Sequence, residues 1–368
     1  MEETLLYDRR TVEALRAAIA REVDRLGRPL QIMEVCGTHT HAIAEAGLRE
    51  ALKPGVRLIS GPGCPVCVTP VSYLDRAEAL ARNHGALLCT FGDLFRVPSS
   101  TGSLERLRAE GADVRILYSP RDALAVARDN TSRPVVFLAV GFETTAPTVA
   151  AALLEAESLG LGNFYLLPGH KTVPQALRLL AADPALRLDG FLLPGHVSVV
   201  TGAGAFAFLG REFGLPSAVV GFTPADILRG VLEIARQRAE GRAETANLYG
   251  RVVTEEGNPR ARALMERLFR PCDAEWRGLG VIPGSGLGLA EEAAPHDASL
   301  LPAEVPPPRE PRGCRCGEVL KGAVEPPQCP LFGKPCTPDL PVGACMVSSE
   351  GTCAAWYRHE RWRLEGFP

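Results

Sequence analysis

From Leu30 to about Gly230, short apolar runs alternate with longer segments of helical period. Eight runs rich in Val, Ile, Leu and Phe are strand candidates: residues 30–35, 56–60, 86–91, 114–119, 134–142, 163–169, 190–195 and 217–222. Strands buried on both faces read as continuous hydrophobic runs, as these do, so the alternation predicts parallel sheets with helices on both sides. The expected fold class is α/β.

The segments between the runs predict helices at residues 41–52, 71–83, 103–111, 120–130, 147–160, 173–181 and 224–241. A further helical stretch lies around Arg260 to Phe269. The segment "PGSGLGLA", which begins at Pro283, has the wrong spacing for a dinucleotide-binding loop, and we expect a turn there.

A chain of 368 residues suggests two or three domains. We expect two similar parallel-sheet α/β domains at residues 30–130 and 131–230, after an N-terminal helical segment at 1–29. Residues 231–368 would form a helical or extended C-terminal domain that carries a cysteine-rich segment. Within it, the Pro-rich stretch 294–313 has few apolar residues and predicts an extended linker or surface wrap.

The composition limits the classes of partner and compartment. A formal net charge of -3 provides no large basic field, so neither nucleic acid nor an anionic membrane is an expected partner. No apolar run approaches the roughly 18 residues that span a bilayer, and no secretory signal is visible, so we expect a cytoplasmic protein. In a reducing compartment, eleven cysteines favour metal or redox chemistry over disulfides.

The unusual polar residues lie where predicted strands end and the following helices begin. In parallel α/β sheets such loops open on the carboxyl edge, where ligands bind, so we expect them to converge. The loops carry Cys36 with His39 and His41, then Cys64 with Cys67, then Asp93, Glu143, His170 and His196. Each histidine could instead be a structural hydrogen-bonding group, and Asp93 or Glu143 a helix N-cap.

Two of these loops contain thiols. In "CGTHTH", a thiolate beside imidazoles suits iron or zinc, and Cys36 lies one helical turn from His39. The alternative is a buried cysteine with surface histidines. In "GPGCPVC", Cys64 and Cys67 lie at a predicted helix start, where amides and the helix dipole lower thiol pKa values. This pair could hold a metal, cycle between dithiol and disulfide, or be structural.

The C-terminal segment has six cysteines among many Pro and Gly residues. Four of them are Cys314, Cys329, Cys336 and Cys353, with Cys316 and Cys345 interspersed. Such a segment cannot form a conventional core, and a 4Fe-4S cluster or a zinc site would supply folding energy. The spacing differs from the paired Cys-x-x-Cys of zinc ribbons, which favours the cluster. A disulfide framework is the remaining alternative.

Six motifs together resemble the HypD family of hydrogenase maturation proteins over about residues 30 to 357: "CGTHTH", "GPGCPVC", "FGDLFRVP", "GFETTAP", "LPGHVS" and "CPLFGKPCTP...VGACMVSSEGTCAAWY". The resemblance implies an iron-sulfur scaffold on which the iron of the NiFe-hydrogenase centre acquires cyanide and carbonyl ligands, giving an Fe(CN)2CO intermediate. It also implies a HypC-type chaperone and a HypE-type cyanide donor as partners, and a fold of two related α/β domains plus a third that carries the cluster.

The resemblance also implies residue roles. Cys36 would hold the iron, with His39 beside it and His196 nearby, while Cys64 and Cys67 would relay electrons. Glu350 would lie near the cluster. The implied ligands of the 4Fe-4S cluster are Cys314, Cys329, Cys336 and Cys353, although Cys316 could compete with Cys314. A different reading of the same residues is a thiol-disulfide oxidoreductase with a structural zinc site.

Overall fold

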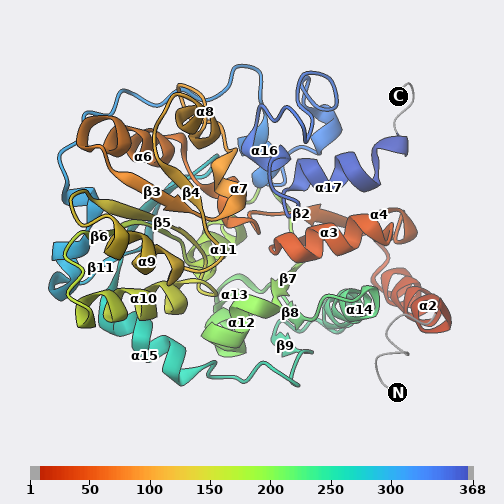
Figure 1. Ribbon diagram of the computed structural model, residues 1–368. Coiled ribbons are helices and arrows are strands. Elements are labelled where there is room, and N and C mark those ends of the chain that lie inside the picture. The colour runs from red at the N-terminus through yellow and green to blue at the C-terminus, as the bar shows by residue number, and fades with distance from the viewer. Residues whose placement is uncertain (1–8, 364–368) are drawn as a thin grey trace.

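The computed structural model describes residues 9–363 and contains two parallel sheets (Figure 1). The first sheet has the order β2-β1-β7-β8-β9 and the second β4-β3-β5-β6. The bounds in the first sheet are β1 Leu30–Glu34, β2 Val56–Ser60, β7 Gly190–Pro194, β8 Ser217–Val220 and β9 Thr245–Asn247. Those in the second are β3 Leu87–Thr90, β4 Val114–Ile116, β5 Val135–Gly141 and β6 Phe164–His170. The predicted α/β class and all eight predicted strands are confirmed.

The sheets interleave along the chain. Each takes two strands from residues 30–130 and two from residues 131–230, because β1 pairs with β7 while β3 pairs with β5. Each sheet therefore contains strands from both sides of residue 130. The proposed domain limits at residues 29, 130 and 230 stay a prediction.

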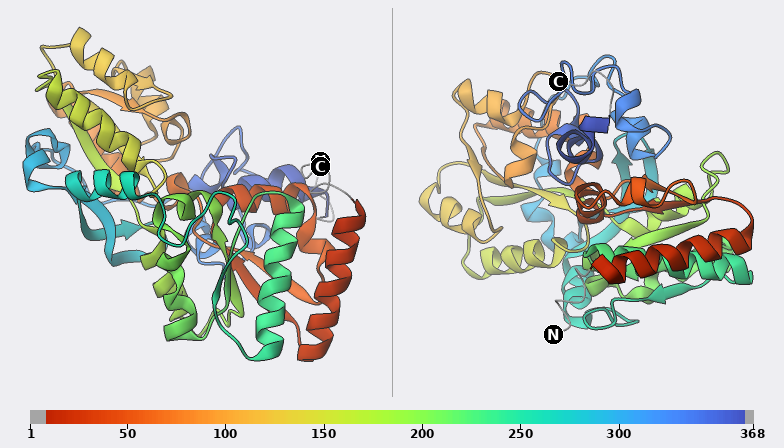
Figure 2. Two further views of the ribbon diagram at one scale, coloured as in Figure 1. Left: turned by 90° about the horizontal axis from the view of Figure 1, so that it is seen from below. Right: turned by 90° about the vertical axis from the view of Figure 1, so that its right-hand side faces the viewer.

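Helices cover both sheets (Figure 2). Before residue 130 they are α2 Arg9–Leu26, α3 Gly37–Glu45, α4 Leu48–Ala51, α5 Pro65–Val68, α6 Val71–His84, α7 Gly92–Phe95, α8 Leu104–Ala109 and α9 Asp122–Asp129. After it they are α10 Ala146–Ser158, α11 Val173–Ala181, α12 Gly195–Thr201, α13 Phe208–Phe213, α14 Pro224–Glu240, α15 Pro259–Leu268, α16 Cys316–Leu320 and α17 Thr352–His359. The 3-10 helices are η1 Ala203–Phe206, η2 Glu291–His296, η3 Ala298–Leu300, η4 Pro326–Gln328, η5 Ala344–Met346 and η6 Arg361–Arg363.

The predicted helices occur with small differences. The helix expected over residues 41–52 is two helices, α3 and α4, because Gly47 between them adopts a left-handed φ of 65°. Helices α2 and α14 lie side by side on one face of the first sheet, where Ile19 and Val23 join a core with Ile227 and Val231 (Figure 2). Within the described residues, no helix is both long and apolar enough to span a bilayer.

An antiparallel hairpin of β10 Phe269–Trp276 and β11 Gly280–Leu289 packs beside the second sheet. It corrects the turn expected at "PGSGLGLA", which lies on β11. Glycine allows the two strands to approach, because a Cβ at Gly286 would lie 2.8 Å from the Cβ of Ala274. Apolar periodicity did not predict this hairpin, because its hydrophobic runs are short and glycines interrupt them.

The C-terminal segment lies against the ends of both sheets, and α17 packs on α3 (Figure 1). Its apolar side chains, among them Val319, Met346 and Ala354, join the same core as Met33 and Leu138 of the two sheets. The segment thus shares the core of the α/β body instead of forming one of its own. The first part of the Pro-rich stretch 294–313 lies in η2 and η3, whereas residues 302–310 form neither helix nor strand. The Arg309 backbone N–H donates to Ser100 Oγ.

Candidate functional site

Cys36 lies between β1 and α3, at the N-cap of the helix. Its thiol is buried, and its backbone N–H donates to Glu34 Oε2 at 3.1 Å. Burial, together with the nearby carboxyl groups of Glu34 and Glu350, raises the pKa of Cys36 to about 12. The thiol is therefore protonated at neutral pH, and a bound metal cation would be needed to hold it as thiolate.

The loop that carries Cys64 packs directly on Cys36. The Gly63 carbonyl accepts a hydrogen bond from Gly37 N at 3.0 Å, and a Cβ at Gly63 would lie only 2.3 Å from Cys36 N. Cys64 caps α5, since its Sγ accepts from Cys67 N at 3.3 Å, and Pro65 occupies the first helical position. The expected Cys-x-x-Cys pair at a helix start is thus present and adjoins Cys36.

His39 of α3 and His196 of α12 meet at Phe222. The His196 ring stacks on Phe222 at a centroid distance of 4.0 Å, and the His39 centroid is 5.2 Å from the same ring. His39 Nε2 lies 2.9 Å from the Gly221 carbonyl oxygen, which can only accept, so Nε2 carries the proton. His39 Nδ1 then keeps its lone pair, and it is buried without a hydrogen-bond partner. Burial lowers the pKa of His39 to about 4, so the ring is neutral.

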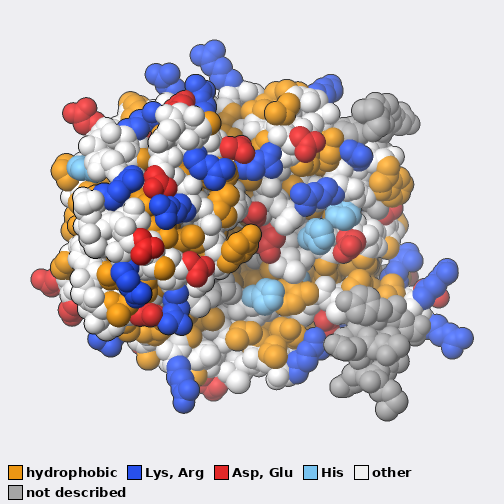
Figure 3. Space-filling view, viewed as in Figure 1, with side chains coloured by type: hydrophobic (Ala, Val, Ile, Leu, Met, Phe, Trp, Pro, Cys, Tyr) orange, Lys and Arg blue, Asp and Glu red, His pale blue; other side chains and the backbone are white. Residues whose placement is uncertain are grey.

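The C-terminal segment covers this group. Thr38 Oγ1 donates to Glu350 Oε1 at 2.9 Å, and a Cβ at Gly37 would lie 2.4 Å from the Cβ of Glu350. Ser348 Oγ donates to Asp93 Oδ2 at 2.6 Å and accepts from Glu350 N at 3.2 Å. Four strand-end loops and the C-terminal segment therefore meet on one face, where histidine and acidic side chains gather between α3, α7 and α12 (Figure 3).

A series of thiols leads away from Cys64. Cys67 is fully buried, and burial raises its pKa well above the ordinary value, with further contributions from hydrogen bonds to Cys345 and Cys64. The Sγ atoms of Cys345 and Cys316 are 3.0 Å apart. Cys316 in turn hydrogen bonds to Cys314, which raises the pKa of Cys314. Cys345 thus connects the Cys-x-x-Cys pair with the other thiols of the C-terminal segment.

Those thiols surround a small cavity. Its lining includes all six cysteines of the segment and no charged side chain: Cys314, Cys316, Cys329, Cys336, Cys345 and Cys353, with Val319, Phe332, Gly343 and Met346. Glycine at 343 keeps the cavity open, because a Cβ there would lie 2.6 Å from Cys314 Sγ. Six soft donors in an apolar wall fit an iron-sulfur cluster or zinc. Among the described side chains, no group of three or more His, Cys, Asp or Glu residues is arranged to hold a metal ion.

All eleven cysteines lie in the described residues, and all are free thiols. The sequence indicated no role for Cys345 and only a possible competition of Cys316 with Cys314, and no spacing in it indicates that Cys345 contacts Cys67 across 278 positions. Phe222, which both histidines contact, is the last residue of the predicted strand 217–222 and carries no polar group that marks it as a site residue. Glu143 and His170 make their contacts elsewhere, around α11 and β10.

One protein-family model and several known proteins match most of this chain in sequence. A family model described as "HypD: Hydrogenase formation hypA family" matches residues 10–360. The hydrogenase maturation factor HypD of Azotobacter vinelandii is 48% identical over 364 residues, which cover 97% of this chain and 96% of the relative. That of Escherichia coli K12 is 47% identical over 343 residues, covering 92% and 91%. That of Rhodobacter capsulatus is 45% identical over 357 residues, covering 94% and 95%.

Proposed function

Because the chain belongs to the HypD family of hydrogenase maturation factors, we propose that it is an iron-sulfur scaffold on which an iron ion acquires cyanide and carbonyl ligands at Cys36. The iron with its ligands is the cargo, to be passed to a NiFe-hydrogenase. One observation carries the proposal: an uninterrupted series of thiol contacts runs from Cys64, beside Cys36, through Cys67, Cys345 and Cys316 to the six-cysteine cavity.

Cys36 is the residue that holds the cargo iron. A low-spin ferrous ion with cyanide and carbonyl ligands requires a polarisable donor, and a thiolate is one. Because burial raises the Cys36 pKa to about 12, binding of iron displaces a proton from the thiol. His39 stays neutral, and its unpartnered Nδ1 lone pair is available to accept a hydrogen bond in the same buried site. Thr38 fixes Glu350 against the start of α3, beside these two residues.

The cavity of the C-terminal segment fits a 4Fe-4S cluster. The four ligands we propose are Cys314, Cys329, Cys336 and Cys353, and a cluster bound there would supply one-electron redox chemistry. This assignment leaves Cys316 and Cys345 as a dithiol, with Sγ atoms 3.0 Å apart, next to the dithiol of Cys64 and Cys67. Each pair can alternate between dithiol and disulfide by exchange with its neighbour.

Membership in a family of maturation factors implies partners in the maturation machinery. We infer that these are a HypC-type chaperone and a HypE-type cyanide donor. His196 is exposed and Glu350 is partly exposed, so the group around Cys36 opens to the surface. A partner that delivers a ligand or removes the iron could reach Cys36 from this face.

Infrared spectroscopy of the anaerobically purified chain with its chaperone tests the proposal, since cyanide and carbonyl on iron absorb where protein does not. Cys36→Ala is expected to abolish these bands while the visible absorbance of the cluster stays unchanged. Cys272→Ala, which removes an exposed thiol on β10, is the matched control and should keep both signals. Surviving bands in Cys36→Ala would refute the role of Cys36.

The second candidate function is a thiol-disulfide oxidoreductase with structural zinc, which the hydrogen-bonded pair of Cys64 and Cys67 at the start of α5 favours. Metal analysis separates the two functions. A brown protein with about four irons per chain supports the scaffold, whereas a colourless zinc protein supports the oxidoreductase.

A further inference from the structure

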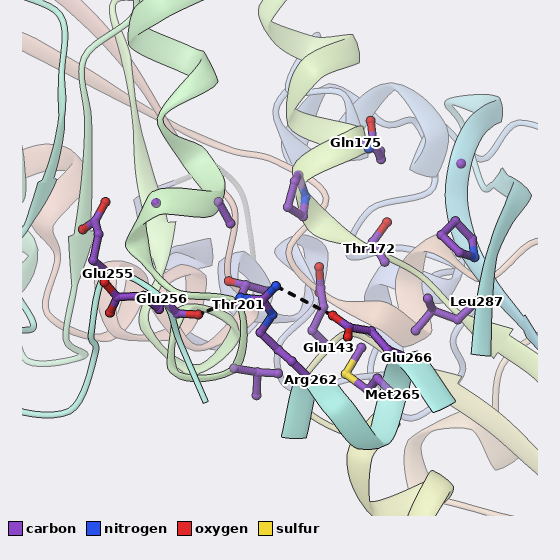
Figure 4. Close-up of a pocket in the computed structure, with 16 residues that line it drawn as sticks. Glu143, Thr172, Gln175, Thr201, Glu255, Glu256, Arg262, Met265, Glu266 and Leu287 are labelled. Carbon is purple, nitrogen blue, oxygen red and sulfur yellow. Dashed lines mark hydrogen bonds and ion pairs between the residues drawn. The ribbon is translucent and has the colours of Figure 1, made fainter. Parts of the chain in front are cut away.

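A cavity of about 570 Å³ lies where α11, α12, α15 and β11 meet (Figure 4). None of the cysteines or histidines of the site around Cys36 lines it. Its wall includes Glu143 of the "GFETTAP" motif and Thr172, which follows the "PGH" residues that end β6. These are the two strand-end motifs that the iron scaffold does not use.

Glu143 supplies an unpartnered acceptor at the base of this cavity. Its side chain is 3% exposed, and Oε1 accepts a hydrogen bond from Val173 N at 2.9 Å. Oε2 is buried and has no hydrogen-bond partner. Figure 4 shows the carboxyl group directed toward the middle of the lining residues. Thr172 Oγ1, in the same cavity, is also buried without a partner. Two buried oxygen atoms of the same cavity wall are therefore placed to receive a donor.

The rest of the wall defines the chemistry of that donor. Three further carboxylates line the cavity, those of Glu255, Glu256 and Glu266, against a single cation. This cation, Arg262, is already engaged, since Nη1 donates to the Glu256 carbonyl at 3.0 Å and Nη2 lies 3.7 Å from Glu266 Oε1. The excess of carboxylates favours a positively charged ligand with N–H donors. Apolar side chains complete the wall: Val200, Met265 and Leu287.

We propose that this cavity binds a protonated amine or guanidinium group carried on an aliphatic chain, with an N–H donated to Glu143 Oε2 and another to Thr172 Oγ1. The aliphatic portion lies against Val200, Met265 and Leu287. Burial raises the pKa of Glu143 to about 7, and a cation at Oε2 would offset that effect by favouring the charged carboxylate. The site is independent of the iron scaffold, so either proposal can fail without the other.

Calorimetric titration of the full chain with agmatine tests this site, because agmatine carries both an ammonium and a guanidinium on a four-carbon chain. We expect agmatine to bind, whereas butanol and butyrate, which lack the cation, do not. Glu143→Gln should weaken binding about tenfold or more, and Thr172→Val about twofold to tenfold, as expected for loss of a charged and a neutral hydrogen bond. Glu157→Gln makes the same charge change at an exposed position on α10 and should leave binding unchanged.

Three results would overturn the proposal: no agmatine binding, equal binding to the Glu143→Gln variant, or equal binding of butyrate. If Glu143→Gln does not fold, Thr172→Val together with Glu266→Gln carries the test, since Thr172 is only partly buried as a residue and Glu266 is exposed. A blocked Gly-Arg-Gly peptide distinguishes the two sources of the cation. Tighter binding of the peptide than of agmatine assigns the cavity to a partner's side chain, and the reverse order assigns it to a free small molecule.

Discussion

Replacing Glu143 with Gln should change how the free energy of unfolding depends on pH. Burial raises the Glu143 pKa from its ordinary value of 4.5 to about 7, so the folded chain holds a proton that the unfolded chain has lost. Between these pH values the folded state binds more protons, and the stability contributed by neutral Glu143 therefore falls as pH rises. Each unit of pKa change corresponds to about 1.4 kcal/mol, so the shift from 4.5 to about 7 changes the free energy of unfolding by about 3 kcal/mol in total.

Gln has the same shape as Glu and does not ionise, so the variant should lack this pH-dependent loss. Urea unfolding of both proteins at pH 5, 6, 7 and 8, with equal iron content, measures the difference. We expect that difference to shift in favour of Glu143→Gln by about 2.5 kcal/mol between pH 5 and pH 8, because part of the full effect lies below pH 5. Glu157→Gln, at an exposed carboxylate, is the control and should show a small, flat difference. A flat difference for Glu143→Gln would refute the claim that the buried carboxyl titrates near neutrality.

Three further variants test the packing around the thiols. Gly63→Ala should abolish the cyanide and carbonyl infrared bands, because its Cβ would overlap the backbone of Cys36. Gly162→Ala is the control and should keep the bands, because there is open space around Gly162. Infrared bands in both variants would contradict the close packing of Gly63 on Cys36. Cys345→Ser should retain about four irons per chain by metal analysis but lose the infrared bands, and loss of the iron would instead make Cys345 a cluster ligand. Arg49→Met should lower the free energy of unfolding by about 3–5 kcal/mol in urea titrations, because it removes a buried cation that faces the buried carboxyl groups of Glu34 and Glu360. A loss below about 1 kcal/mol would contradict this expectation.

The secondary structure was largely readable from the sequence because it follows from local patterns. Continuous apolar runs indicated eight buried strands, and the periodic segments between them indicated the helices. The strands that were missed have weak local signals. β9 spans only Thr245–Asn247, β10 is mostly exposed and has no continuous apolar run, and β11 is rich in glycine, which is uncommon inside strands.

The pairing of the strands could not be read in the same way. β1 lies beside β7, about 160 residues away, and β3 beside β5. Several orders of similar buried strands satisfy the same hydrophobic pattern, so the choice depends on how all the helices and the C-terminal segment pack together. The expectation that six strand-end loops converge was met by four of them, while Glu143 and Thr172 form a separate cavity.

The amino-acid sequence by itself determined which residues carry reactive groups and that these follow buried strands, because strand ends and residue types are local properties of the chain. Only the tertiary structure decided which groups are neighbours: that Gly63 lies on Cys36, that Cys345 joins Cys67 to Cys316, and that His39 keeps an unpartnered nitrogen. The physical reason is that burial and contact over hundreds of residues depend on close packing of the whole core, and the same packing sets the pKa values of the thiols and imidazoles.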